Sequence, residues 1–377
     1  MPNCDLYTYA ASGVQGLHPY QPGKPISTLA REIGMDESNI IKLASNENPL
    51  GPSPKVNAAV TAQLSEQARY PDGGTVELRA QLAQHHGCKA EQITVGNGSN
   101  DVLDLIARVF LGEGVSGERC STVFSQHAFA VYPLSSQAVG AELITVPAKQ
   151  WGHDLEAMAA AVREDTRVVW VANPNNPTGT WVGHDALYRF LQQIPAEVVV
   201  VVDEAYIEFV ADTDYPDSSQ WLEEFPNLIV TRTFSKAYGL AGYRIGYGLS
   251  SEGVADLLNR VRQPFNVNAL AQVAAIAALD DPAHVERGVA LNSAEMMKMT
   301  HAFEHLKLEW IPSVGNFVSV DLGQPAMPIF AALEQQGVIT RPVANYGLPN
   351  HLRISIGLPE ENQRSIQVLT QILREQA

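Results

Sequence analysis

The run Val198-Val-Val-Val-Val202 leads directly into Asp203-Glu-Ala-Tyr206. Five consecutive valines disfavour a helix, because branching at Cβ restricts the side chain against the preceding helical turn. Residues 167–172 and 228–231 form two further short apolar runs that end in turn-forming or polar residues. Continuous apolar strands of this kind are typical of a parallel sheet that is covered on both faces. The sequence therefore predicts an α/β fold with a mostly parallel sheet.

The elements around these strands predict a large domain followed by a smaller one. An alanine-rich helical region is expected at about 270–307, and the strands expected at 316–320 and 352–356 flank a helix at 329–337. We expect an irregular N-terminal arm at 1–45, a large α/β domain at 46–275 and a smaller α+β domain at 276–377. Clefts between such domains, beyond the carboxyl ends of parallel strands, usually hold ligands.

The composition restricts the kinds of partner that the chain can bind. Its 377 residues include 25 Lys and Arg against 41 Asp and Glu, a formal net charge of −16. Such a chain is repelled by phosphate backbones and anionic lipids, so neither nucleic acid nor a membrane is expected as a partner.

The sequence shows no signal-peptide run and no stretch of about 18 apolar residues. Cys4, Cys88 and Cys120 lie far apart without metal-ligand spacing. We expect a cytoplasmic protein that binds no metal.

A lysine and an aspartate each follow an expected strand. The segment 233–246 reads TFSKAYGLAGYRIG and places Lys236 just after Ser235 and eight residues before Arg244. Taken alone, it could be a strand followed by a solvated basic loop. Asp203 ends the valine run, and a poorly solvated carboxylate there needs a partner. A protonated ring nitrogen is suitable, because a neighbouring carboxylate favours its charged form. A helix N-cap is the simpler alternative for Asp203.

Two loops offer further polar groups. Asn173-Pro-Asn-Asn-Pro-Thr-Gly179 is a tight turn after the strand at 167–172, from which Asn176 can present its amide. Gly96-Asn-Gly-Ser-Asn100 precedes an amphipathic helical pattern. A helix N-terminus presents free N–H groups and a positive dipole end to an anion. Gly98, Ser99 and Asn100 are therefore candidates for an anion site, although Ser99 or Asn100 could simply cap the helix.

These segments together supply partners for the functional groups of one cofactor. Pyridoxal phosphate carries a phosphate, an aldehyde, a pyridine nitrogen and a phenolic oxygen. Their candidate partners are, in that order, residues 98–100 with Ser235 and Arg244, then Lys236, then Asp203, and finally Asn176 with Tyr206. Each segment is weak evidence alone, but their combination predicts a pyridoxal phosphate site.

The motifs NPNNPTG (173–179), DEAY (203–206) and SKxxxLAGxRxG (235–246) resemble, in this order, those of fold type I aminotransferases. The resemblance covers essentially the whole chain. LASNENPLG (43–51), RYPD (69–72) and the ending GVITR (337–341) with LRISIG (352–357) are similar to the histidinol-phosphate aminotransferase subgroup. This resemblance implies a large-domain sheet of the seven-stranded type and an N-terminal arm that packs with the smaller domain.

The resemblance also implies roles for the cofactor residues. Lys236 would bind the cofactor covalently and move a proton between the substrate carbon and the C4′ atom of the cofactor, and Asp203 would keep the ring nitrogen protonated. Tyr70 matches a tyrosine that completes the phosphate site of the neighbouring subunit, which implies a homodimer with shared active sites. The other implied contacts are Asn176 and Tyr206 at the ring oxygen, Gly98, Ser99, Asn100, Ser235 and Arg244 at the phosphate, and Phe129 stacked on the ring, with His127 as the alternative.

The implied substrate contacts are less specific. Arg353 matches an arginine that binds the substrate anion, Arg341 matches a second one at the substrate phosphate, and Tyr20 matches a residue that closes over the substrate. Asn176 is also expected to contact the substrate. Two guanidinium groups suit a phosphate, because their paired donors match its geometry. However, related aromatic aminotransferases use the equivalent of Arg353 for a carboxylate, and Arg341 could be an ordinary surface residue.

The resulting expectation is pyridoxal-phosphate-dependent transamination of histidinol phosphate with 2-oxoglutarate, giving imidazole acetol phosphate and glutamate, in histidine biosynthesis. An aromatic amino acid or arogenate aminotransferase is the first alternative on the same scaffold. A phospho-amino-acid decarboxylase and a non-catalytic relative that keeps the fold are the others. The retained Lys236 and the absence of a spare DNA-binding segment argue against the last of these.

Overall fold

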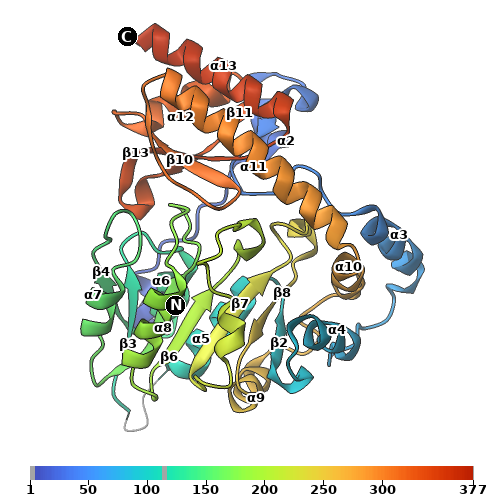
Figure 1. Ribbon diagram of the computed structural model, residues 1–377, viewed down its shortest axis with the longest axis vertical. Helices are drawn as coiled ribbons and strands as arrows, with labels where there is room; N and C mark the ends of the chain where they lie inside the picture. Colours follow the sequence, from blue (N-terminus) through green and yellow to red (C-terminus); the bar gives the residue numbers. More distant parts are fainter. Residues whose placement is uncertain (1–4, 113–116, 377) are drawn as a thin grey trace.

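A seven-stranded sheet forms the lower half of the view in Figure 1, and a four-stranded sheet lies above it. The computed structural model describes residues 5–112 and 117–376, so Cys4 lies outside the described residues. The strands are β1 (Ile41–Lys42), β2 (Ile93–Gly96), β3 (Ser121–Ser125), β4 (Glu142–Val146), β5 (Thr166–Ala172), β6 (Val199–Asp203), β7 (Leu228–Thr233), β8 (Gly246–Leu249), β9 (Glu309–Ile311), β10 (Phe317–Asp321), β11 (Val338–Ile339), β12 (Arg341–Val343) and β13 (Leu348–Ser355). The α-helices are α1 (Ser12–Gln15), α2 (Ile26–Ile33), α3 (Pro54–Gln63), α4 (Val76–His86), α5 (Ser99–Phe110), α6 (Val131–Ala138), α7 (Leu155–Ala160), α8 (His184–Gln193), α9 (Glu252–Val261), α10 (Ala269–Leu279), α11 (Pro282–His305), α12 (Ala326–Gln335) and α13 (Pro359–Gln376).

The large sheet has the strand order β2-β8-β7-β6-β5-β3-β4. Strand β8 runs antiparallel to both of its neighbours, and the other pairs are parallel. The register places Ala172 beside Asp203 and Asp203 beside Thr231. The carboxyl ends of β5, β6 and β7 therefore lie side by side. This confirms the predicted α/β fold with a mostly parallel, seven-stranded sheet.

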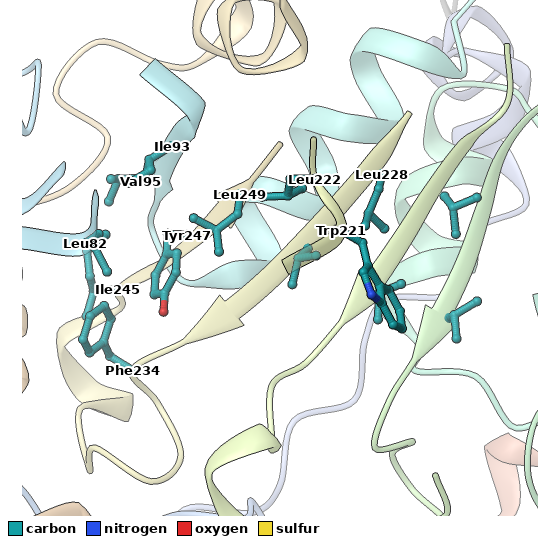
Figure 2. Close-up of a cluster of buried hydrophobic side chains, with 14 of the residues drawn as sticks. Leu82, Ile93, Val95, Trp221, Leu222, Leu228, Phe234, Ile245, Tyr247 and Leu249 are labelled. Carbon is teal, nitrogen blue, oxygen red and sulfur yellow. The ribbon is translucent and has the colours of Figure 1, made fainter. Parts of the chain in front are cut away.

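Both faces of the large sheet are covered by helices, which explains the unbroken valine run. Val200 and Val202 belong to one core, together with residues of α4, α8 and α10, whereas Val199 and Val201 belong to another core with α5, α6 and α9. Successive side chains of a strand point to opposite faces, so a strand covered on both faces must be apolar throughout. Figure 2 shows part of the first core, with Leu82 of α4 close to two labelled side chains of β2.

The four-stranded sheet has the antiparallel order β12-β13-β10-β9. Its apolar face packs against helices α11, α12 and α13, which lie at the top of the view in Figure 1. Strand β1 pairs in parallel with β11 and so attaches an N-terminal segment to this part of the molecule. The domain boundaries at 45/46 and 275/276 stay predictions. Within the two described ranges, no helix is long and apolar enough to cross a membrane.

One segment prediction needs correction, and a second gains detail. The expectation of irregular structure throughout 1–45 is wrong, because Ser12–Gln15 forms α1, Ile41–Lys42 forms β1 and Ile26–Ile33 forms α2. Leu29 of this helix is buried beside Ile339 of β11, and Gly34 ends the helix in the left-handed region at φ 67°. The preceding Pro- and Gly-rich residues dominated the local pattern and hid a helix whose burial depends on a distant strand. The helical region expected at about 270–307 is two helices, because Pro282 starts a new one.

Candidate active site

A cavity of about 320 Å³ opens beyond the carboxyl ends of β5, β6 and β7. Most of the predicted site residues line it, although they come from segments spread over the whole chain. They are Tyr20, Ser99, Asn100, Phe129, Asn176, Asp203, Tyr206, Ser235, Lys236, Arg244, Arg341 and Arg353. A cavity with convergent polar groups at the carboxyl edge of a parallel sheet is the expected location of a binding site in such folds.

Lys236 projects into this cavity just beyond the end of β7. Its Nζ atom donates a hydrogen bond to the carbonyl oxygen of Ser45 at 3.1 Å and lies 5.7 Å from the centroid of the Tyr206 ring. Burial lowers the pKa of Lys236 from 10.5 to about 8, and the neighbouring positive charge of Arg353 adds to this effect. A larger fraction of the amine is therefore neutral near neutral pH, which is the state that acts as a nucleophile or base.

Asp203 presents a carboxylate with one satisfied and one unsatisfied oxygen. The hydroxyl of Tyr132 donates to Oδ2 at 2.8 Å, whereas the buried Oδ1 has no hydrogen-bond partner among the described residues. Burial raises the pKa of Asp203, and the hydrogen bond from Tyr132 opposes that rise. The Tyr132 ring is held in place by parallel stacking on Trp170, with ring centroids 5.2 Å apart. A cationic N–H group in the cavity would satisfy the remaining carboxylate oxygen.

Tyr206 and Asn176 have defined hydrogen-bonding states. The side-chain amide of Asn46 donates to the Tyr206 hydroxyl oxygen at 2.8 Å. Burial raises the pKa of Tyr206 to about 12, so its own proton stays available for donation at neutral pH. Asn176 accepts a hydrogen bond on Oδ1 from the guanidinium of Arg353 at 2.7 Å. Its amide nitrogen is therefore the group left to donate toward an oxygen in the cavity.

Close backbone approaches bring Arg244 to the N-terminus of α5. Gly98 precedes the helix at φ 82°, and a Cβ atom there would lie 2.5 Å from Nη2 of Arg244. A Cβ atom on Gly246 would lie 2.3 Å from the backbone nitrogen of Ser99. Only glycine fits at both positions. The helix N-terminus, a guanidinium and the hydroxyls of Ser99 and Ser235 thus surround one end of the cavity, which suits a phosphate group.

Two arginines face each other across neighbouring strands at the other side of the cavity. Arg341 of β12 lies directly opposite Arg353 of β13 in the sheet register. Arg353 is buried and donates to the carbonyl of Ala44 at 2.6 Å, and Arg341 donates to the carbonyl of Gln21 at 2.6 Å. Like charges directly opposite one another in a sheet are destabilising unless an anion lies between them. The pair therefore favours an anionic ligand, and Tyr20 covers it with its ring 5.6 Å from the Arg341 guanidinium.

The structure separates Tyr70 from the other predicted residues. Its side chain is 82% exposed and stacks on Phe265 with ring centroids 4.6 Å apart, outside the set of residues that line the cavity. Phe129 lines the cavity, whereas the alternative His127 does not. Instead, Nδ1 of His127 lies 2.6 Å from the carbonyl oxygen of Tyr346.

Residues that the sequence analysis did not assign also line the cavity. Among them are Asn46, Glu47, Tyr132 and Tyr346. Asn46 and Glu47 lie inside the LASNENPLG motif, so the motif marked the segment without showing which side chains face the site. Tyr132 lies three residues after Phe129, and its backbone N–H donates to the Phe129 carbonyl oxygen at 3.1 Å, so a single turn of the chain brings both side chains to the cavity.

Comparison with known proteins agrees with this geometry. Residues 38–369 match the family "Aminotransferase class I and II", so the chain belongs to that family. It is 58% identical over 369 residues to histidinol-phosphate aminotransferase 2 of Pseudomonas aeruginosa, covering 98% of this chain and 99% of that protein. It is 53% identical over 370 residues to histidinol-phosphate aminotransferase 1 of Nitrosococcus oceani, covering 98% of both chains. These matches confirm the resemblance that the motifs indicated.

Solved structures confirm the fold. Histidinol-phosphate aminotransferase from Sinorhizobium meliloti, in complex with pyridoxal-5'-phosphate, superimposes with a TM-score of 0.87 at 31% identity and covers 97% of this chain and 98% of that chain. An aspartate aminotransferase from Thermus thermophilus matches with a TM-score of 0.82 at 20% identity, a likeness that concerns the fold alone.

Proposed function

We propose that this protein is a pyridoxal-phosphate-dependent aminotransferase that exchanges an amino group between histidinol phosphate and 2-oxoglutarate. The observation that carries the proposal is one cavity that contains Lys236, the half-satisfied carboxylate of Asp203 and the facing pair of Arg341 and Arg353. The names of the close relatives support the same substrate.

The residues of the cavity fit pyridoxal phosphate group by group. Oδ1 of Asp203 lacks a donor, and a protonated ring nitrogen would supply one. Tyr206 and Asn176 offer donors for the ring oxygen, and the α5 N-terminus with Arg244 offers a cradle for the phosphate. When bound, the cofactor supplies an electron sink that makes the proton on the substrate carbon easier to remove. Asp203 contributes by keeping its ring partner charged in a buried environment.

Lys236 would both hold the cofactor and move the substrate proton. Its lowered pKa leaves a substantial neutral fraction near pH 8, and its Nζ atom is positioned by the Ser45 carbonyl. A base with a pKa near the working pH combines the correct protonation state with a useful driving force for proton transfer. Lys236 would take the proton from the carbon that carries the amino group and deliver it to the C4′ atom of the cofactor.

Arg341 and Arg353 would bind the phosphate of histidinol phosphate. A dianionic phosphate between two guanidinium groups accepts several paired hydrogen bonds, and it relieves the repulsion between the facing arginines. Tyr20 would then close over the bound substrate, because its ring lines the cavity and lies 5.6 Å from the Arg341 guanidinium. Glutamate could use the same arginines through its carboxylates.

A homodimer with shared active sites would give Tyr70 a role that one chain alone does not. Tyr70 and Phe265 form an exposed aromatic pair, and aromatic residues are enriched in protein interfaces. Tyr70 of one protomer would complete the phosphate site of the other, and the dimer would act in the cytoplasm. Sedimentation of the purified protein tests the assembly. A monomer with full activity would contradict it.

A spectroscopic titration tests the reaction. The visible absorbance of the purified holoenzyme should fall on addition of histidinol phosphate and return with 2-oxoglutarate. A response to phenylalanine but not to histidinol phosphate would instead favour an aromatic aminotransferase, and release of carbon dioxide would favour a decarboxylase. A protein that stays colourless with added pyridoxal phosphate would refute the cofactor assignment.

A further inference from the structure

Glu47 is an unassigned carboxylate at the cavity. Among the described residues that line the cavity, the acidic side chains are Asp203 and Glu47. Asp203 is buried and already bonded to Tyr132, whereas the side chain of Glu47 is 45% exposed. A carboxylate that faces a cavity rich in cations, yet takes no part in the cofactor contacts, needs another explanation.

The local structure holds Glu47 firmly. Both of its carboxylate oxygens lie within hydrogen-bond distance of the Lys42 ammonium, at 3.0 and 3.1 Å. The adjacent Asn46 has a left-handed backbone at φ 55°, and its N–H donates to Ser355 at 2.8 Å while its carbonyl accepts from Asn316 at 2.9 Å. A carboxylate offers about four acceptor positions, so the single lysine leaves acceptor capacity on a residue that lines the cavity.

The proposed substrate has one polar group that the other residues leave unbound. Its phosphate is assigned to Arg341 and Arg353, and its amino group is assigned to the reaction at Lys236. The imidazole ring remains, and its N–H requires an acceptor when it leaves water. Two other acceptors at the cavity are already engaged, because Asn176 binds Arg353 and the Tyr206 oxygen binds Asn46.

We propose that Glu47 forms an imidazole subsite, in which its carboxylate accepts a hydrogen bond from a ring N–H of the substrate. The inference rests on the proposed function and adds the basis of substrate selectivity. A phenyl ring offers no N–H, so an aromatic amino acid would cover the carboxylate without bonding it. A site that hydrogen-bonds a polar group of its substrate discriminates against an analogue that lacks this group, because covering the carboxylate removes bound water without replacing its hydrogen bond. Glu47 thus favours histidinol phosphate over phenylalanine.

The test compares the half-reaction with histidinol phosphate and the half-reaction with glutamate in the same holoenzyme. The loss of visible absorbance measures each of them. Histidinol phosphate carries the imidazole, and glutamate does not. A hydrogen bond to a charged group in a partly exposed site predicts about a tenfold rise in the apparent dissociation constant for histidinol phosphate in Glu47→Leu, with a smaller rise in Glu47→Gln. The glutamate half-reaction should be unchanged or improved, because a nearby negative charge opposes the glutamate carboxylates.

Lys42→Met is the matched control. It breaks the same ion pair but keeps the Glu47 charge, so histidinol phosphate should bind as well as or better than in the wild type. Equal losses in Lys42→Met and Glu47→Leu, or equal losses for both substrates, would overturn the subsite and assign the pair a structural role. A wild-type enzyme that reacts with glutamate but ignores histidinol phosphate would instead refute the proposed function itself.

Discussion

Replacing Lys236 by methionine should stabilise the cofactor-free protein at neutral pH. Burial lowers the pKa of this lysine from 10.5 to about 8, so the folded state disfavours its charged form. At 1.36 kcal/mol per pKa unit, keeping it charged costs about 3 kcal/mol below pH 8. Methionine avoids that cost and keeps a similar volume, but it loses the hydrogen bond to Ser45, worth about 1 kcal/mol. We expect a net gain of about 2 kcal/mol in the free energy of unfolding.

The sign of the pH dependence follows from the lowered pKa. Below pH 8 the lysine is charged in both states and the folded protein carries the full penalty. Above pH 10.5 it is neutral in both states and the penalty is gone. The advantage of Lys236→Met should therefore shrink between pH 8 and 10.5 and then reverse slightly, because only the lost hydrogen bond remains.

Urea unfolding of the cofactor-free wild type and variant at pH 7 and pH 10 measures this difference. Lys149→Met, at an exposed lysine that lines no part of this cavity, is the control and should show little pH-dependent change. A Lys236→Met variant that is no more stable than the wild type at pH 7, or that differs from it equally at both pH values, would show that the buried charge carries no such penalty.

Three further substitutions test other parts of the site and fold. Tyr132→Phe removes one donor from a buried carboxylate and should weaken cofactor binding at least tenfold in a fluorescence titration; Tyr188→Phe, which removes an exposed tyrosine–carboxylate bond, should not. Arg353→Lys replaces a planar guanidinium, whose paired N–H donors match a phosphate, by a single ammonium, and should lower kcat/KM for histidinol phosphate about 100-fold. An equal loss of cofactor affinity would contradict the substrate role of Arg353. Gly239→Ala, with φ 71° and a Cβ atom 2.3 Å from a backbone carbonyl, should destabilise the protein by about 3 kcal/mol in urea unfolding. Gly34→Ala, at φ 67° with open space, should cost only about 1 kcal/mol, so similar losses would refute the steric argument.

The strands were predictable because their signals are local. A valine run between turn-forming residues has few alternatives to a buried strand, and β6 lies within one residue of the expected run. Helix α2 was missed for the opposite reason. Its apolar face is buried against β11, some three hundred residues away in the chain, and its N-cap Pro25 makes no side-chain capping bond.

Local pattern was also sufficient to nominate Lys236 and Asp203. Asp203 ends β6 and Lys236 lies just beyond β7. Neighbouring parallel strands end at the same edge of a sheet, so the two side chains converge there. Arg341 and Arg353 could be nominated by resemblance, but their facing positions follow from the pairing of β12 with β13.

Only the tertiary structure shows the contacts that set the hydrogen bonding and orientation of these side chains. Tyr132 bonds Asp203 across 71 positions, Asn46 bonds Tyr206 across 160, and Glu47 enters the same cavity from the N-terminal segment. No periodicity of 2 or 3.6 residues extends over such separations, and a motif does not show which of its side chains faces inward. The local sequence therefore nominated the candidate groups of the site, whereas packing between distant segments determined their hydrogen bonds, their orientation and the further carboxylate that lines the cavity.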